Sequence, residues 1–198
     1  MSQTNRNSIR KLTLAAVFMA LAIVLTRFLS INVAVFRFGF GMVPVHLAGY
    51  LLGPFWGALT GLLADLIGLM INAGGTPHLG ITFTTAMHGF LAGMVVYWNK
   101  SRLNPLTATV SGVLTSILCS LLLMSFWLSQ LFGDGFTIVL QARAVNVFGQ
   151  GLALIIVETL LIPVLYSIRR YLPKGTEISW RLNRTEDKYG KISEPSDK

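Results

Sequence analysis

Long apolar runs, separated by short polar or glycine-rich breaks, occupy most of the chain. They cover residues 12–29, 42–52, 55–71, 81–98, 106–132 and 136–168. Because a helix needs about 20 residues to cross a bilayer, these runs predict six membrane spans, of which the second is short or tilted. The period-2 alternation of an outer-membrane barrel is absent from them. The expected fold is therefore an all-α integral membrane protein, a bundle of six transmembrane helices.

The two ends of the chain differ from this apolar region. Residues 1–11 are a short basic segment, residues 12–168 form the expected membrane domain, and residues 169–198 are a polar, basic tail. A basic start followed by an apolar run is also typical of a signal peptide. Since the first run has no small-residue cleavage site and further spans follow it, we expect a first helix that is retained.

Composition and charge agree with a membrane protein and predict its orientation. Charged residues make up 12% of the 198 residues, against roughly a quarter in a soluble domain. The net charge is +8, and 13 of the 16 Lys and Arg residues fall in the N-terminal segment, the loop at 99–105 or the tail. The positive-inside rule makes that side the cytoplasm. Both termini are thus expected to be cytoplasmic in a cell membrane, and the basic excess indicates topology rather than a nucleic-acid partner.

Three arginines break this rule and fall at the opposite, outer face. Arg27, Arg37 and Arg143 suit an anionic ligand, because a guanidinium holds a carboxylate through two hydrogen bonds and keeps its charge. Interfacial arginines that reach lipid headgroups are the alternative. Asn146 and Gln150 follow Arg143 on one helical face. This polar stripe predicts either a ligand site inside the bundle or hydrogen bonds between helices.

Two acidic residues lie within the apolar runs. Asp65 is near the middle of the third run, where an ionisable group is costly and indicates a functional site. It would accept hydrogen bonds from a ligand or pair with an arginine. Glu158 lies deeper in the last run, and we expect it to be a packing partner or part of an interaction surface.

The three histidines have different settings. His88 follows Thr84 by four residues, which makes a second polar patch on the fourth run, and His78 lies in the glycine-rich loop at 72–80, a candidate lid. His46 is in the short second run and is more typical of a packing residue. The spacing of the three does not match a zinc motif, so no metal site is expected.

Aromatic and small residues add two further hypotheses. Phe38, Phe83 and Trp127 belong to an outer aromatic group that would stack on a planar ring or form an interfacial belt. Ala16 and Ala20 lie one helical turn apart on the first helix, and glycines recur every four residues at 49–61 and at 89–93. Small residues at this spacing let helices approach closely, within the bundle or against another membrane protein. No nucleotide-binding motif is present, so ATP-driven work would need partner proteins.

Three segments resemble a known family. They are RFGFG at 37–41, PVHLAGYLLGPFWGALTGLLADLIG at 44–68 and GITFTTAMHGFLAG at 80–93. They are similar to the substrate-binding S components of energy-coupling factor (ECF) vitamin transporters, a class of ABC transporter, and within them to the folate-specific branch. The resemblance covers roughly residues 10–170, although the third segment departs from the commoner PGFTLSA pattern.

The resemblance implies a high-affinity folate-binding subunit with the six-helix S-component fold. It implies that the chain is not an enzyme and holds no cofactor, because a transmembrane coupling protein and two ATPases, which bind ATP and magnesium, drive uptake. Arg27 with Arg37 or Arg143 would meet the glutamyl tail of folate, and the pterin ring would lie deeper. The expected ligand-binding residues are Arg27, Arg37, Phe38, Asp65, His78, Phe83, Thr84, His88, Trp127, Arg143 and Asn146. The expected partner-binding pair is Ala16 and Ala20.

Three alternatives remain at this point. The first is an S component for another vitamin or a vitamin precursor, with the same fold. The second is a membrane-embedded enzyme that uses Asp65, His46 and His88 as acid–base or metal groups, which requires these side chains to converge. The third is a structural membrane-interaction protein, for which the buried polar stripes would be an unexplained cost.

Overall fold

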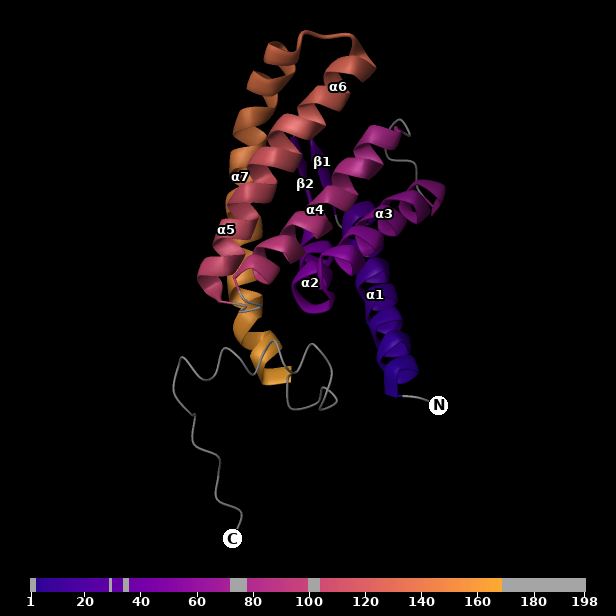
Figure 1. Cartoon of the computed structure of the whole chain (residues 1–198). Coiled ribbons are helices and arrows are strands. Elements are labelled where there is room, and N and C mark those ends of the chain that lie inside the picture. The colour runs from indigo at the N-terminus through magenta and orange to yellow at the C-terminus, as the bar shows by residue number, and fades with distance from the viewer. Residues whose placement is uncertain (1–2, 29, 34–35, 72–77, 100–103, 169–198) are drawn as a thin grey trace.

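The computed structural model describes residues 3–28, 30–33, 36–71, 78–99 and 104–168, and most of them are helical (Figure 1). The helices are α1 (Gln3–Arg27), α2 (Met42–Leu52), α3 (Pro54–Ile71), α4 (Leu79–Trp98), α5 (Pro105–Thr115), the π-helical segment η1 (Ser116–Leu123), α6 (Met124–Phe132) and α7 (Phe136–Ile168). Because α5, η1 and α6 follow one another without a break, each predicted apolar run corresponds to one helical rod.

Four of these rods are long and apolar enough to cross a membrane, judged by length and composition. They are Pro54–Ile71, Leu79–Trp98, Pro105–Phe132 and Phe136–Pro163, and Met42–Leu52 is a shorter apolar helix. The first residue of α1 and the last residue of α7 lie at the same end of the bundle (Figure 1). The described residues thus support a helical membrane bundle with four candidate spans.

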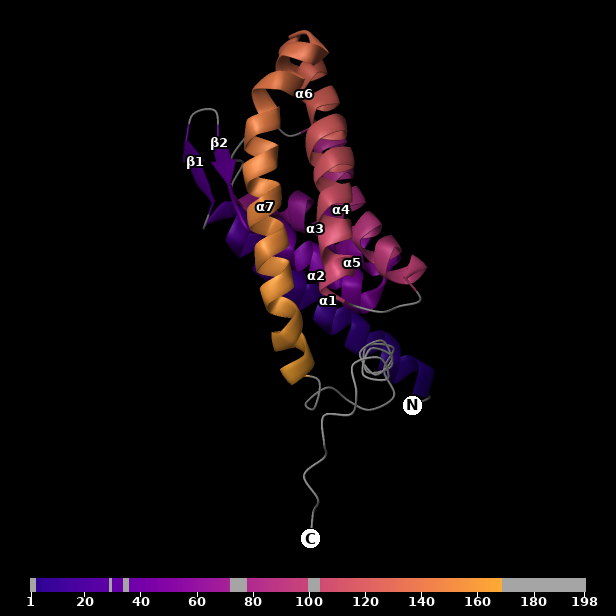
Figure 2. The same cartoon turned by 90° about the vertical axis from the view of Figure 1, so that its left-hand side faces the viewer.

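A small β-hairpin interrupts the helical pattern between α1 and α2. Strand β1 (Ile31–Val33) pairs antiparallel with β2 (Phe36–Phe38), with Ile31 opposite Phe38. The hairpin lies beside α7 (Figure 2). No strand is predicted from the sequence here, because three residues are too few to show an alternating pattern.

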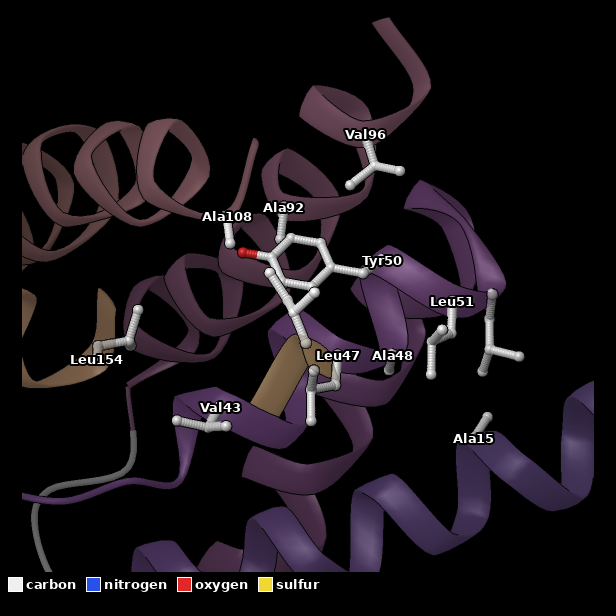
Figure 3. Packing of buried hydrophobic residues seen from close by; sticks show 12 residues of the cluster. Ala15, Val43, Leu47, Ala48, Tyr50, Leu51, Ala92, Val96, Ala108 and Leu154 are labelled. Carbon is white, nitrogen blue, oxygen red and sulfur yellow. The ribbon is translucent and has the colours of Figure 1, made fainter. Parts of the chain in front are cut away.

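Helix α2 is the centre of the core. All of its residues from Val43 to Leu52 are buried, and Tyr50 packs among Leu47, Ala92 and Ala108 (Figure 3). The outward faces of the other helices carry exposed large apolar side chains. Such a surface is typical of lipid contact.

Glycines bring α2, α3 and α4 into backbone contact. A Cβ atom built on Gly49 or on Gly57 would lie 2.5 Å from the carbonyl oxygen of Gly89. A Cβ atom on Gly61 would lie 2.5 Å from the carbonyl oxygen of Thr85. No side chain fits at these positions, so the four-residue glycine spacing predicted from the sequence is used for packing inside the bundle.

We expect Gly89→Ala to destabilise the protein. The new methyl group would overlap the carbonyl oxygen of Gly57, and overpacking of this kind costs about 1–3 kcal/mol. The matched control is Gly135→Ala, since the nearest atom to a Cβ atom there is 3.6 Å away. The apparent unfolding temperature in detergent measures both variants, and equal temperatures would contradict the close contact.

Candidate ligand-binding site

Polar side chains from α1, α3, α4, η1 and α7 converge on one cavity of about 170 Å³, here called the polar cavity. Concave sites with a few convergent polar groups are the usual form of small-molecule sites. Its polar lining consists of Thr26, Arg27, Ser30, Asp65, Thr84, Thr85, His88, Ser120, Arg143, Asn146 and Gln150. Six of the residues predicted from the sequence to bind a ligand therefore lie together.

Arg27 and Asp65 form an ion pair at the wall of the polar cavity. The Arg27 Nη2 atom lies 3.2 Å from Asp65 Oδ1, and the side chains are 6% and 13% exposed. The Thr82 hydroxyl donates a hydrogen bond to Asp65 Oδ2 at 2.7 Å. A Cβ atom on Gly68 would lie 2.8 Å from Arg27 Nε, so the glycine leaves room for the guanidinium. Of the two roles open for Asp65, the structure shows the pairing with an arginine.

Arg143 and Asn146, both on α7, keep unused polar atoms at the cavity. Arg143 Nη2 donates to the backbone carbonyl of Ser120 at 3.4 Å. Within the described part of the chain, Arg143 Nε and Asn146 Oδ1 are buried and have no hydrogen-bond partner. Since buried polar groups are nearly always paired, one donor and one acceptor here are suited to a ligand.

A second cavity of about 280 Å³ adjoins the first and is lined mainly by apolar residues. It shares Arg27, Asp65, Ile81, Met124 and Arg143 with the polar cavity. Its other lining residues are Leu69, His78, Leu128, Leu131 and Phe132. The two arginines therefore lie between a polar space and a more apolar one, here called the apolar cavity.

His46, which the sequence analysis treated as a packing residue, belongs to a buried polar network. Its Nδ1 atom lies 2.6 Å from Glu158 Oε1, and its Nε2 atom lies 3.2 Å from His88 Nδ1. The Tyr50 hydroxyl donates to Glu158 Oε2 at 2.7 Å. Glu158 is fully buried, so it is a packing partner and not part of an interaction surface. No group of three metal-binding side chains occurs among the described residues.

Other predicted residues lie outside the polar cavity. Phe83 on α4 is 52% exposed and faces away from its buried neighbours Thr82 and Thr84. Trp127 packs against His78, with the centroids of the two rings 5.6 Å apart. The structure describes the backbone of Arg37 and Phe38 in β2, but their side chains fall outside the described residues.

The remaining predicted residues have structural positions of their own. His78 is the N-cap of α4, and its Nδ1 atom accepts a hydrogen bond from the Gly80 amide at 3.1 Å. Gln150 donates to the Gly39 carbonyl at 3.2 Å, which joins the segment after the hairpin to α7. Ala16 and Ala20 are exposed on α1. Most of the candidate lid at 72–80 lies outside the described residues.

Among the polar lining residues that were not predicted from the sequence, which include Thr26 and Ser30, Ser120 contacts a predicted residue. Its hydroxyl lies 3.2 Å from His88 Nε2, and it belongs to the π-helical segment η1. π-Helical turns are frequent at functional sites because they change which side chains face inward. A four-residue helical spacing does not indicate this position, because Ser116, four residues earlier, does not line the polar cavity.

Comparisons with known proteins agree with this geometry. The family model "ECF transporter, substrate-specific component" matches residues 10–166. A folate transporter FolT of Clostridium novyi (strain NT) is 32% identical over 131 residues, which cover 66% of this chain and 75% of the relative. A folate transporter FolT of Leuconostoc mesenteroides is 30% identical over 123 residues, which cover 62% of this chain and 65% of the relative.

A solved structure supports the fold. The crystal structure of FolT bound with folic acid superposes with a TM-score of 0.65, covers 76% of this chain and 90% of its own, and is 23% identical. At this identity the likeness concerns the fold. The match of the family model over most of the chain, together with the C. novyi relative, shows that this chain belongs to the family of ECF transporter substrate-specific components.

Proposed function

We propose that this chain is the folate-binding subunit of an ECF vitamin transporter in the cell membrane. The observation that carries the proposal is the convergence of Arg27, Arg143 and Asn146 on one cavity, with buried polar atoms of Arg143 and Asn146 that have no partner within the described part of the chain. The relatives named folate transporter and the neighbour bound with folic acid support folate as the ligand.

The linings of the two cavities differ in a way that matches the parts of folate. Folate joins a planar pterin, rich in N–H and C=O groups, to a benzoate and a glutamate with carboxylates. The polar cavity offers hydrogen-bonding partners for the pterin, and the apolar cavity suits the benzoate ring. Arg27 and Arg143, which line both cavities, are placed to hold carboxylate groups.

The transport cycle requires partners. In this proposal the chain has six spans and cytoplasmic termini, and a transmembrane coupling protein docks on α1 at Ala16 and Ala20. Two ATPases bind ATP and magnesium and supply the energy, so this chain needs no cofactor of its own. The exposed alanines, flanked by the exposed apolar residues Leu12, Val17 and Leu21, support a helix–helix contact in the membrane.

The enzyme alternative loses support from the geometry. His46 and His88 do converge, but both carboxylate oxygens of Asp65 are engaged by Arg27 and Thr82. The fully buried Glu158 holds His46 from the other side. An S component for a different vitamin remains the competing identity, and a thermal-shift screen of vitamins on the purified protein separates the two.

We expect Arg143→Ala and Arg27→Ala each to weaken folate binding by about tenfold to a hundredfold, the effect of losing one hydrogen bond to a charged group. Binding of 6-hydroxymethylpterin, which has no benzoate or glutamate, should change much less. Isothermal titration calorimetry measures both ligands. The control is Gln141→Ala, an exposed position on the same helix. Full folate affinity in both arginine variants would contradict the assignment.

We expect Ala16→Leu and Ala20→Leu to prevent assembly with the coupling protein, because the larger side chains keep the two helices apart. Folate binding by the isolated subunit should be unchanged. Co-purification with the coupling protein and ATPases measures assembly, and Ala142→Leu, at an exposed alanine of α7, is the matched control. If both α1 variants assemble as well as the wild type, the docking face lies elsewhere.

A further inference from the structure

A network of hydrogen-bonded polar groups runs from α7 through α2 and α4 to η1 at the polar cavity. It begins at Glu158, passes through His46 and His88, and ends at Ser120. Of these four residues, His88 and Ser120 line the polar cavity, whereas His46 and Glu158 do not. Glu158 is thus outside the cavity lining but is connected to the cavity wall by hydrogen bonds.

With Glu158 ionised and His46 neutral, the hydrogen bond between them has one direction. An ionised carboxylate can only accept hydrogen bonds, and Glu158 Oε2 accepts one from the Tyr50 hydroxyl. Glu158 Oε1 therefore accepts from His46 Nδ1, 2.6 Å away. A neutral imidazole has one N–H and one bare nitrogen. With its proton on Nδ1, His46 presents a bare Nε2 atom to its other neighbour.

The direction of this hydrogen bond determines the directions of the next two, which lead to the cavity wall. The bare His46 Nε2 atom accepts from His88 Nδ1 at 3.2 Å, which places the proton of His88 on Nδ1 as well. His88 Nε2 is then bare, and the hydroxyl of Ser120 donates to it at 3.2 Å. The one lone pair of His88 Nε2 is then used by Ser120, and the lone pairs of the Ser120 hydroxyl oxygen are the hydrogen-bond acceptors at the cavity wall.

We propose that Glu158 is a positioning residue that fixes the tautomers of His46 and His88, so that this wall of the polar cavity accepts hydrogen bonds and selects a ligand with an N–H group there. The buried Asn146 Oδ1 atom, also at the cavity, is another acceptor without a partner among the described residues. The chemistry that matches is a planar heterocycle with amide or amino N–H donors. The identity of the ligand as a pteridine rests on the proposed function, but the tautomers do not.

Nitrogen-15 NMR of the full chain without ligand tests the tautomers directly. The chain has three histidines, so single-histidine substitutions assign the signals. We expect His46 and His88 both to be neutral with the proton on Nδ1. A proton on Nε2 of either ring, or a doubly protonated His46, would overturn the inference, whatever ligand the protein binds.

Glu158→Gln tests whether Glu158 sets the direction of these hydrogen bonds. Tyr50 can hold the amide oxygen while the amide NH₂ group donates to His46 Nδ1, which reverses both tautomers. We therefore expect the Nε2–H form of His88 to appear in this variant. The matched control is Tyr50→Phe, which removes the hydrogen bond to Glu158 Oε2 and leaves the link to His46 intact. If His46 and His88 keep their tautomers in Glu158→Gln, another group sets the hydrogen-bond directions, and the proposal is overturned.

The ratio of the dissociation constants of two ligands is a second readout, and a loss of protein stability alone would not change it. Folate has a 4-oxo group and an N3–H donor, whereas 4-amino-4-deoxyfolate has a 4-amino donor and a bare N3. We expect Glu158→Gln to move the ratio of the two dissociation constants toward one by about tenfold, the equivalent of one hydrogen bond, and Tyr50→Phe to preserve it. An unchanged ratio in Glu158→Gln overturns the inference. If neither compound binds the wild type, the proposed function fails and the NMR result still decides the tautomers.

Discussion

The backbone contact between the glycines of α2, α3 and α4 is the constraint on which the polar cavity depends. It brings the rings of His46 and His88 to a centroid distance of 5.4 Å and lets Thr82 on α4 reach Asp65 on α3. In a membrane no water can satisfy polar groups that lose their partners. Helices held further apart would leave these side chains unpaired. The glycine spacing therefore allows the hydrogen bonds between helices as well as the close packing.

The two cavity arginines have different surroundings, which suggests different roles. Arg27 is held by Asp65, which cancels its charge in an apolar setting, and Gly68 makes space for it. Arg143 donates a hydrogen bond to the backbone carbonyl of Ser120, and its Nε atom has no hydrogen-bond partner within the described residues. Arg27 is therefore the better positioned cation, and Arg143 the one with more capacity for a new partner.

Much of the fold and part of the site were predictable. The apolar runs indicated the helices, and Asp65, Thr84, His88, Arg143 and Asn146 were singled out because polar groups within membrane helices face the interior. Phe83 was placed in the site as one of several aromatics at one end, but its neighbours Thr82 and Thr84 take the inward face. Ser120 was missed because its direction depends on the π-helical turn of η1, which no regular helical period describes.

The sequence by itself determined the helical class, the sorting of basic residues, the glycine spacing and the resemblance to ECF S components. Only the tertiary structure decided the pairings, such as Arg27 with Asp65, 38 residues apart, and His46 with Glu158, 112 residues apart. The physical reason is that lipid and protein interior are both apolar. Hydrophobic periodicity, which shows the buried face of a helix in a soluble protein, does not reveal it here. The rotation of each helix about its axis is set by contacts with its neighbours.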